Sequence, residues 1–361
     1  MSTTSKCALI MAGGTGGHIF PGLAVAHALR DKGWRVHWFG GTGTAGQASM
    51  ESQLVPPQGF AFEAIDFGGL RGKGVRTVLM LPLRLLKAFG QSLSVLRRVR
   101  PDVVVGLGGY ITFPAGLMSA LSGRPLLLHE QNSVAGLANK VLARVARRVF
   151  TAFPDVLPKA SWVGNPLREA FLQVPAPEQR FAGRQGPLKL LVLGGSLGAK
   201  ALNDAVPQAL ALLPPDQRPE VCHQSGAKQI DALRANYAAA GVTAQLTPFI
   251  DDTAAAMADA DLLICRAGAS TVTEIAAVGV AALFVPFPFA VDDHQTSNAR
   301  FLTGHGAGWL MPQTELTPRA LADLLHGLQR SELLDKARKA RALQQREATA
   351  QVVAACEELS S

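Results

Sequence analysis

Short apolar runs alternate with amphipathic segments and glycine turns along almost the whole chain. In the first half, the apolar runs cover residues 7–11, 35–39, 103–107, 125–129 and 149–152. In the second half, they cover residues 188–193, 220–223, 244–247, 262–265, 282–285 and 308–311. Short runs of this kind between helical patterns are typical of strands in a parallel sheet that helices cover on both faces. The pattern therefore predicts an α/β fold.

The two halves of the chain begin in the same way. The strand at 7–11 leads into a glycine-rich turn at 13–17 and a helical pattern at 21–30. The strand at 188–193 leads into a second glycine-rich turn at 194–198 and a helix at 200–213. Each start is typical of the first strand, loop and helix of a Rossmann-like domain. The glycine and proline at 163–166 favour a boundary there, giving domains at 1–164 and 165–345. The tail at 331–359 reads as a helix, and we expect residues 346–361 to pack back on the first domain.

The length and composition of the chain agree with two domains, each with its own hydrophobic core. The chain has 361 residues, more than a single hydrophobic core usually contains. Of these residues 48% are hydrophobic and 17% are charged, and this composition excludes a disordered chain. Its longest apolar stretch, 281–291, is interrupted by Pro286 and Pro288, so we expect no transmembrane helix, and the N-terminus lacks a secretory pattern. The four cysteines are far apart, which predicts reduced thiols and no zinc site. We therefore expect a cytoplasmic location.

A net charge of +8 indicates an anionic partner: lipid, nucleic acid or a phosphorylated substrate. The chain has two tyrosines and no aromatic residues interleaved with basic clusters, so no nucleic-acid partner is expected. Residues 75–100 place leucines among cations such as Arg84 and Lys87. This pattern predicts a basic amphipathic surface for anionic lipid, or alternatively a core helix whose polar face is basic.

The glycine turns favour phosphate binding without identifying a common nucleotide motif. Neither turn has the spacing of a dinucleotide fingerprint, and no P-loop sequence is present. Glycines between a strand and a helix still allow backbone amides to approach a phosphate closely, unless they serve only as tight turns. A third glycine turn, at 106–110, follows another strand. These turns predict a phosphorylated ligand and no cofactor.

Three further groups carry candidate chemistry. His18 follows the first glycine turn and is either a base or a contact to a diphosphate, or alternatively a helix cap or a solvated side chain. Glu274 lies at the start of a predicted helix, where its carboxylate can accept hydrogen bonds from the hydroxyls of a ribose. Alternatively, it forms a capping box with Thr271. Asp259 and Asp261 look like a metal pair, but their position before a buried strand favours the end of a helix, so we expect no metal site.

Together the motifs resemble one family. They are Gly13-Gly14-Thr15-Gly16-Gly17-His18, Gly108-Gly109-Tyr110, His129-Glu130-Gln131-Asn132, Gly164-Asn165-Pro166, Gly194-Gly195-Ser196, the run from Arg266 to Glu274, and Asp293-His294-Gln295. In this order they resemble the MurG family of UDP-N-acetylglucosamine:undecaprenyl-diphospho-muramoyl-pentapeptide N-acetylglucosaminyltransferases. The resemblance covers essentially the whole chain and implies the GT-B fold, two Rossmann-like domains whose parallel sheets face a central cleft.

The resemblance also implies roles for individual residues. Phe249 and Ile250 correspond to uracil contacts, and Glu274 to the ribose ligand. The diphosphate site corresponds to Ser196, Gly268, Ala269, Ser270 and Thr271. Contacts to the GlcNAc sugar correspond to Asn132, His294 and Gln295. The remaining substrate contacts correspond to Thr15, Gly16, Gly17, Tyr110 and Arg168, and the base to His18 or Glu130.

The implied reaction is an inverting transfer of GlcNAc from UDP-GlcNAc to the 4-hydroxyl of MurNAc in lipid I, giving lipid II. Partners then include the undecaprenyl-linked acceptor, an anionic membrane surface, and cell-wall synthesis and division proteins, at the cytoplasmic face of the inner membrane. Helix N-termini would stabilise the departing UDP without a metal. The rivals are a UDP-GlcNAc epimerase on the same fold and a membrane-associated nucleotide-sugar sensor without catalysis.

Overall fold

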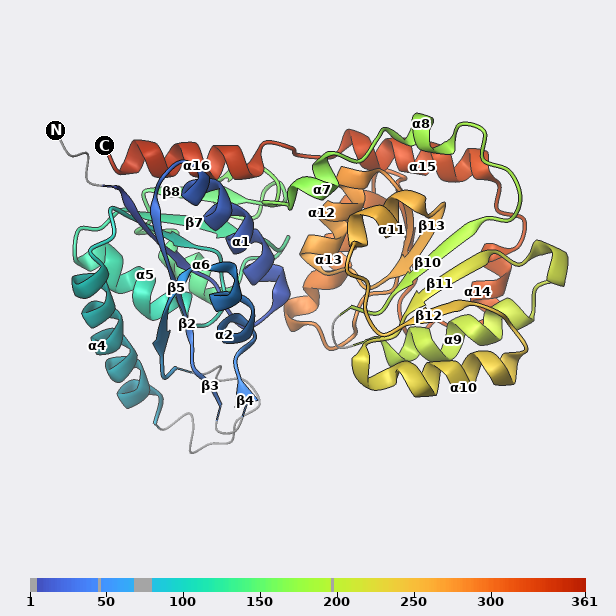
Figure 1. The fold of residues 1–361 in the computed structure, drawn as a ribbon, viewed down its shortest axis with the longest axis horizontal. Coiled ribbons are helices and arrows are strands. Elements are labelled where there is room, and N and C mark those ends of the chain that lie inside the picture. The colour runs from blue at the N-terminus through green and yellow to red at the C-terminus, as the bar shows by residue number, and fades with distance from the viewer. Residues whose placement is uncertain (1–4, 45–46, 68–79, 196–197) are drawn as a thin grey trace. The chain divides into compact units, whose positions relative to one another are not determined.

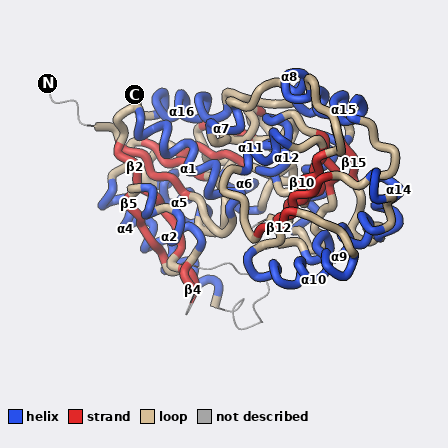
Figure 2. Tube along the Cα trace, turned by 45° about the vertical axis from the view of Figure 1, so that its right-hand side comes forward, coloured by secondary structure: helices blue, strands red, loops and turns tan. Residues whose placement is uncertain are grey.

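In the computed structural model, the chain forms two α/β units, each built on its own parallel sheet (Figure 1). The structure describes residues 5–44, 47–67, 80–195 and 198–361. Unit 1 comprises Met1–Arg168 and Gln345–Ser361, and unit 2 comprises Glu169–Gln344. In both units the strands lie between layers of helices (Figure 2).

Unit 1 contains a seven-stranded sheet in the order β5-β2-β1-β6-β7-β8-β9, with all neighbouring strands parallel. Its strands are β1 (Cys7–Met11), β2 (Arg35–Gly41), β5 (Ala61–Ile65), β6 (Val103–Gly106), β7 (Leu126–Glu130), β8 (Arg148–Thr151) and β9 (Ser161–Trp162). A separate antiparallel pair joins β3 (Gly43–Thr44) and β4 (Gln47–Ala48). Its helices are α1 (Gly16–Asp31), α2 (Met50–Leu54), α4 (Leu81–Val99), α5 (Thr112–Leu121), α6 (Leu137–Leu142) and α16 (Ala348–Leu359).

Alternate residues of each central strand of unit 1 face different cores, as the two-residue period of a strand requires. Ala8 and Ile10 of β1 pack in the core that includes α1 and α16, whereas Leu9 and Met11 pack in the core that includes α4 and α5. Helix α16 contributes Val352 to the first of these cores. The last helix of the chain is therefore part of the first unit.

Unit 2 repeats this arrangement with six parallel strands in the order β12-β11-β10-β13-β14-β15. The strands are β10 (Lys189–Leu193), β11 (Glu220–Gln224), β12 (Gln245–Thr247), β13 (Leu262–Cys265), β14 (Ala281–Phe284) and β15 (Gly308–Leu310). The helices are α7 (Glu169–Leu172), α8 (Pro177–Phe181), α9 (Lys200–Ala211), α10 (Ile230–Ala240), α11 (Thr253–Asp259), α12 (Ala269–Val278), α13 (His294–Thr303), α14 (Pro318–Leu325) and α15 (Arg330–Ala342).

The structure differs from the predicted elements at several places. Helix α1 begins at Gly16 and carries Pro21 inside it, whereas the sequence predicts a start at Pro21, because glycines favour turns over helices. The predicted helix at 331–359 is two helices, α15 and α16, separated by 343–347. Strand β5 was not predicted, because its sequence AFEAI is short and is interrupted by a glutamate, and in the structure only its last residue is buried.

Each sheet reverses its strand order next to its first strand. The reversal lies between β1 and β6 in unit 1 and between β10 and β13 in unit 2. In open parallel sheets of this kind, ligands bind beyond the carboxyl ends of the strands at that point. A ligand site is therefore expected at each of the two points of reversal.

Candidate active site

His18 lies at the point of reversal in unit 1, in the first turn of α1. Its ring packs against Gly108, which follows β6: a Cβ built on Gly108 would lie 2.8 Å from the His18 ring. His18 Nδ1 is 2.8 Å from Oε1 of Gln131, which follows β7. Three loops at the carboxyl ends of parallel strands thus fix this imidazole, and its Nε2 makes no hydrogen bond to any described residue. Thr15 occupies the N-cap position of α1, and His18 lies inside the helix. The alternative that His18 caps the helix therefore does not hold.

The bond to His18 belongs to a longer buried chain of hydrogen bonds. Nε2 of Gln131 lies 3.0 Å from Nδ1 of His129 and donates to the carbonyl of His129 at 3.1 Å. His129 Nε2 in turn lies 2.8 Å from the carbonyl oxygen of Gly164. His129 is fully buried, and burial lowers its pKa to about 4. It is therefore neutral near pH 7.

Glu130, the rival base, is 2% exposed and surrounded by donors. Its Oε1 accepts from the backbone N–H of Asn132 at 2.9 Å and from the Asn132 side chain at 3.4 Å. Its Oε2 accepts from the N–H of Gly136 at 3.1 Å and from the side chain of Asn139 at 2.8 Å. This carboxylate therefore holds the loop after β7, including Asn132, in shape.

A second buried carboxylate, Glu51 of α2, was missed by sequence reasoning. It is 0% exposed and accepts from the backbone N–H of Gly14 and of Gly41, each at 3.1 Å. The glycine turn of unit 1 is thus tied to a negative charge, and the Gly14 amide is not open to a phosphate. The two amides are far from Glu51 in sequence, so no local pattern marks it.

The other predicted residues of unit 1 lie around the same turn. Thr15 is exposed and makes no side-chain cap, and Gly16 and Gly17 begin α1. Tyr110 packs on the turn, since a Cβ on Gly14 would lie 3.7 Å from its ring. Burial, and secondarily the Glu51 charge, raises the pKa of the Tyr110 hydroxyl. Arg168 is exposed, with its guanidinium 5.6 Å from the centre of the Phe20 ring.

In unit 2, the glycine turn after β10 is held from the side by Gln224. The Gly195 N–H donates to Gln224 Oε1 at 3.1 Å, and Gln224 Nε2 donates back to the Gly195 carbonyl at 3.1 Å. Gly195 has φ 78°, and a Cβ built on it would meet no described atom within 4 Å, so the turn is open on that side. Ser196 lies outside the described residues.

Helix α12 begins beside this turn, after β13, the neighbour of β10. Gly268 is its N-cap, with no side-chain cap and no acidic residue in the first turn. Ala269, Ser270 and Thr271 form that first turn, and the buried Ser270 Oγ bonds to no described residue. Free amides at a helix N-terminus, with their partial positive charge, suit an anion.

Glu274 lies in the second turn of α12 and is half-buried. Because Thr271 is inside the helix and Gly268 caps it, the alternative of a Thr271–Glu274 capping box does not hold. The carboxylate is close enough to Cys265, at the end of β13, to add to burial in raising the pKa of that thiol. Glu274 thus lies one turn after the uncapped start of its helix.

Gln295 connects two of the loops at the carboxyl edge of this sheet. Its Oε1 accepts from the backbone N–H of Phe287 at 2.9 Å and of Ala267 at 3.3 Å. His294 precedes it as the first residue of α13. Sequence reasoning missed the support from Arg266, which donates to the carbonyls of Val285 and Pro286 at 3.0 and 3.1 Å.

Phe249 and Ile250 follow β12. Phe249 is 60% exposed, and its carbonyl accepts from the Thr247 hydroxyl at 2.6 Å. The Ile250 N–H makes no hydrogen bond to a described residue, so it is open to a ligand. Both residues also line a cavity of about 410 Å³, but its lining includes Lys189 and Glu220, the first residues of β10 and β11. That cavity therefore follows the sheet and reaches the edge opposite the glycine turn.

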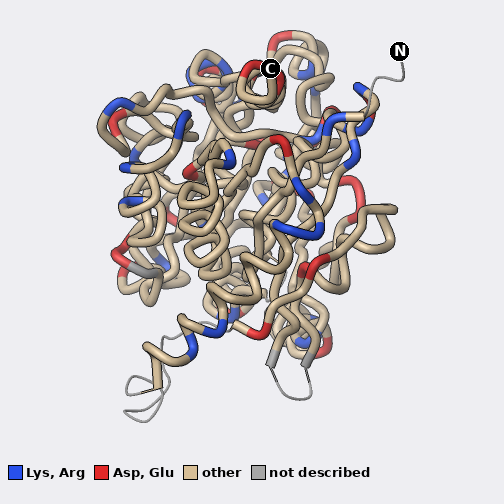
Figure 3. Tube along the Cα trace, turned by 90° about the vertical axis from the view of Figure 1, so that its left-hand side faces the viewer, with Lys and Arg blue, Asp and Glu red and all other residues tan. Residues whose placement is uncertain are grey.

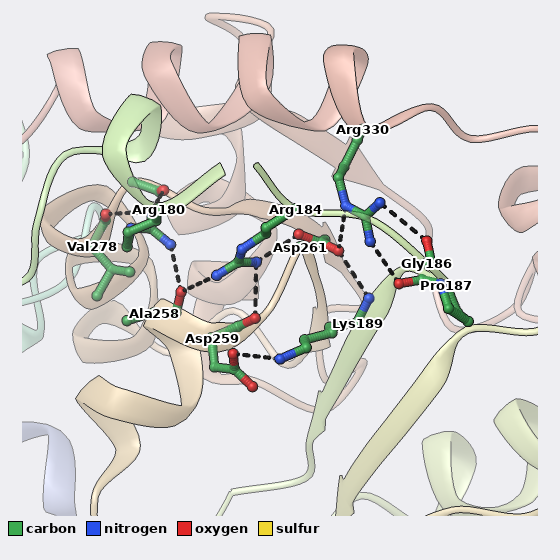
Figure 4. Close-up of polar contacts among 11 residues, drawn as sticks. Arg180, Arg184, Gly186, Pro187, Lys189, Ala258, Asp259, Asp261, Val278 and Arg330 are labelled. Atoms are coloured by element: carbon green, nitrogen blue, oxygen red, sulfur yellow. Dashed lines mark hydrogen bonds and ion pairs between the residues drawn. The ribbon is translucent and has the colours of Figure 1, made fainter. Parts of the chain in front are cut away.

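The acidic pair at 259 and 261 is structural (Figure 4). Asp261 is 0% exposed and forms ion pairs with Arg184 at 2.6 Å and Arg330 at 3.2 Å. Asp259 pairs with the Lys189 side chain at 2.7 Å. The prediction that the pair caps or solvates a helix end is wrong for Asp261, because two arginines compensate its buried charge. No group of three or more His, Cys, Asp or Glu suited to a metal occurs in the described ranges.

Known proteins match both units. The glycosyltransferase family 28 N-terminal domain matches residues 8–151, and the family 28 C-terminal domain matches residues 189–353. A relative from Albidiferax ferrireducens is 75% identical over 99% of this chain and 92% of its own length, and one from a Polaromonas species is 72% identical over 99% and 93%. Both are named UDP-N-acetylglucosamine–N-acetylmuramyl-(pentapeptide) pyrophosphoryl-undecaprenol N-acetylglucosamine transferase.

Solved structures agree. The crystal structure of Acinetobacter baumannii MurG has a TM-score of 0.85 and 42% identity, over 98% of this chain and 99% of that one. The glycosyltransferase of kitacinnamycin, at 16% identity and a TM-score of 0.70 over 98% and 99%, shares the fold alone. The predicted GT-B class, with two Rossmann-like domains, and the resemblance inferred from the motifs are both confirmed. With both of its domains matched and full-length relatives at more than 70% identity, the chain belongs to glycosyltransferase family 28.

Proposed function

We propose that this protein transfers GlcNAc from UDP-GlcNAc to the 4-hydroxyl of MurNAc in lipid I, with inversion at the anomeric carbon, to form lipid II. The observation that carries the proposal is the identity of 75% and 72%, over 99% of the chain, to relatives named for this transfer. The geometry supplies the corresponding groups: an imidazole with an open nitrogen in unit 1, and an uncapped helix N-terminus beside a glycine turn in unit 2.

The donor belongs to unit 2 in this proposal. The diphosphate binds at the glycine turn that carries Gly195 and Ser196 and at the start of α12, where partial positive charge stabilises the UDP leaving group. The ribose hydroxyls bind Glu274, which stands one turn further along the same helix. The uracil binds against Phe249 and the open N–H of Ile250, and Gln295 and His294 lie at the same sheet edge for the sugar.

The acceptor and the base belong to unit 1. His18 takes the proton from the attacking hydroxyl, because its Nε2 is open whereas Glu130 is enclosed by four hydrogen-bond donors. Glu130 then acts by shaping the loop that presents Asn132. Thr15, Gly16 and Gly17 precede His18 at the start of α1, Tyr110 packs on the same glycine turn, and in this proposal they contact the acceptor's sugar and diphosphate.

A lipid-linked acceptor requires the enzyme to work at a membrane surface. Among the described residues, no helix is both long and apolar enough to cross a bilayer. The first part of α4 exposes Leu83 at 61% and Leu86 at 70%, next to the exposed cations Arg84 and Lys87. We call these four residues the α4 surface. Figure 3 shows basic positions along α4 where it emerges from the undescribed segment 68–79.

The α4 surface supports peripheral docking on anionic lipid. Its opposite face is buried through Ala88, Val95 and Leu96, so the helix packs on the sheet with one side and leaves leucines in water on the other. Exposed large apolar side chains beside cations are typical of interfacial helices. Residues 75–79 of the predicted stretch lie outside the described residues. We propose that this surface holds the protein on the cytoplasmic face of the inner membrane, with cell-wall synthesis and division proteins as further partners.

One assay separates the proposal from its rivals. The protein is incubated with radiolabelled UDP-GlcNAc and a soluble lipid I analogue, and the label is followed by chromatography. A transferase moves the label to the acceptor, an epimerase converts the nucleotide sugar without acceptor, and a sensor does neither. Absence of labelled acceptor at saturating substrates would refute the proposed transfer.

A further inference from the structure

The hydrogen-bond chain that ends at His18 determines which nitrogen of that imidazole carries the proton. It runs from the carbonyl of Gly164 through His129 and Gln131 to His18, with donor–acceptor distances of 2.8, 3.0 and 2.8 Å. Hydrogen positions follow from which groups can only accept and which can only donate. They can be assigned one link at a time from the buried end.

The first link is His129. A carbonyl oxygen only accepts, so the contact between His129 Nε2 and Gly164 requires a hydrogen on Nε2. His129 is fully buried and neutral, with a pKa of about 4, so it carries one ring hydrogen. Its Nδ1 is therefore an unprotonated acceptor.

The second link is the amide of Gln131. One end of it faces two acceptors, Nδ1 of His129 at 3.0 Å and the His129 carbonyl at 3.1 Å. Only the NH₂ group satisfies both, since an oxygen there would lie against two lone pairs in a buried site. The amide oxygen must then point at His18.

The third link is His18 itself. Its Nδ1 lies 2.8 Å from an oxygen that only accepts, so Nδ1 carries the hydrogen in the neutral ring. We propose that His129 and Gln131 are positioning residues that hold neutral His18 in the Nδ1–H tautomer, leaving the Nε2 lone pair to accept a proton. The proposal deepens the proposed function, because it rests on His18 as the base of the transfer.

The arrangement also suits the protonated state. When Nε2 takes a proton from a hydroxyl, the ring becomes an imidazolium and keeps its Nδ1–H bond to Gln131, which strengthens because the donor is now charged. No link of the chain has to reverse. A histidine in the other tautomer would place its Nδ1 lone pair against the Gln131 oxygen and would present an N–H to the substrate, where it cannot act as a base.

The tautomer is measured directly by nitrogen NMR of the whole protein labelled at histidine. The chain has 8 histidines, and the His18 signals are identified by their loss in His18→Gln. At mildly alkaline pH, we expect His18 to show a protonated Nδ1 and an unprotonated Nε2. In Gln131→Met, which keeps the side-chain length but removes the acceptor, the two tautomers should mix. A His18 with its hydrogen on Nε2 in the unaltered protein would overturn the proposal.

Kinetics supply the second readout. Gln131→Met should lower kcat by about 10- to 100-fold, the usual cost of removing a group that orients an imidazole, and leave KM for UDP-GlcNAc unchanged. The control is His223→Phe, which deletes the other buried histidine, bonded to Tyr237 and Asn203 in unit 2. It should lower stability but change neither the His18 signals nor kcat.

The two ideas fail separately. If His18→Gln keeps full activity, His18 is not the base, yet the NMR result still decides whether the chain fixes its tautomer. If Gln131→Met keeps the kcat of the unaltered protein, the positioning role is wrong even when His18 is essential. If Gln131→Met does not fold, the tautomer measured in the unaltered protein decides alone.

Discussion

At the scale of single residues, buried carboxylates shape the loops of unit 1 by accepting hydrogen bonds from loop amides. Glu130 accepts from Gly136 and Asn132, and Glu51 accepts from Gly14 and Gly41. A buried acceptor of this kind is costly to remove, because each donor left without a partner loses its hydration as well as its bond. A carboxylate that only supports a loop should therefore lower stability when it is replaced, whereas a catalytic carboxylate should lower kcat.

Glu130→Gln tests whether this carboxylate is a base or a loop support. The amide places an NH₂ group where two of its partners donate, so we expect a loss of about 1 to 3 kcal/mol, or a melting temperature lower by roughly 2 to 10 °C. The kcat of the folded protein should fall less than about tenfold, below the contribution of a general base. Glu358→Gln, an exposed residue paired with Arg148, is the control and should melt unchanged. An unchanged melting temperature with a kcat lower by two orders of magnitude would make Glu130 the base.

Glu274→Ala tests the proposed ribose contact. A contact made equally in the ground and transition states contributes uniform binding, so its loss should raise KM for UDP-GlcNAc and leave kcat nearly unchanged. One hydrogen bond to a charged group is worth about 1.5 to 3 kcal/mol, so the loss of even one of the two should raise KM roughly 10- to 150-fold. Glu332→Ala, on α15, is the control. A fall confined to kcat would show that Glu274 acts in the chemical step instead.

At the scale of elements, the sequence predicted where helices and strands lie better than it predicted how they end. The strand at Cys7–Met11 was recognised because all five residues are apolar, and the structure buries all five. The start of α1 was missed because Gly16 and Gly17 are helical in spite of their low helix propensity. For the site, His18 was found from its place after a glycine turn, whereas Glu51 and the role of Gln131 depend on contacts between distant segments.

Helix α4 carries a prediction about the membrane. Arg84→Glu removes one attraction to anionic lipid and adds one repulsion, so at about 1 kcal/mol per charge it should weaken vesicle binding roughly 30-fold. Arg97→Glu makes the same charge change on the same helix about 20 Å further along, beyond the exposed leucines, and should have a smaller effect. Binding is measured by co-sedimentation with anionic and neutral vesicles, with UDP-GlcNAc affinity as the check on unit 2. Equal effects of the two substitutions would mean that general charge, and not the α4 surface, holds the protein on lipid.

At the scale of the whole molecule, each unit buries one neutral histidine. The repeated turn sequences predicted the doubled Rossmann-like plan, because each half carries its own strand, glycine turn and helix. The sequence could not show which of the histidines are buried, because burial depends on how the sheet and its helices assemble and not on neighbouring residues in the chain. His129 lies at the end of β7 and His223 in β11, and burial lowers their pKa values to about 4 and about 3. The stability of both units is therefore expected to fall in acid.

The sign of this response follows from the direction of the shifts. The unfolded chain binds a proton on each histidine near pH 6.5, whereas the folded units resist it until about pH 4 and about pH 3. The stabilising contribution is therefore fully present above pH 6.5 and is lost progressively as the pH falls toward the folded pKa values. For His129 the loss is on the order of 3 kcal/mol.

Urea unfolding at a series of pH values measures this loss unit by unit. Three of the four tryptophans, Trp34, Trp38 and Trp162, report on unit 1, and Trp309 reports on unit 2. His223→Phe should flatten the pH dependence of the Trp309 transition while leaving that of unit 1, because it removes the group that binds the extra proton. His326→Gln, at an exposed position, is the control and should leave both slopes unchanged. A Trp309 transition with the same pH slope before and after His223→Phe would show that other groups control the acid lability of unit 2.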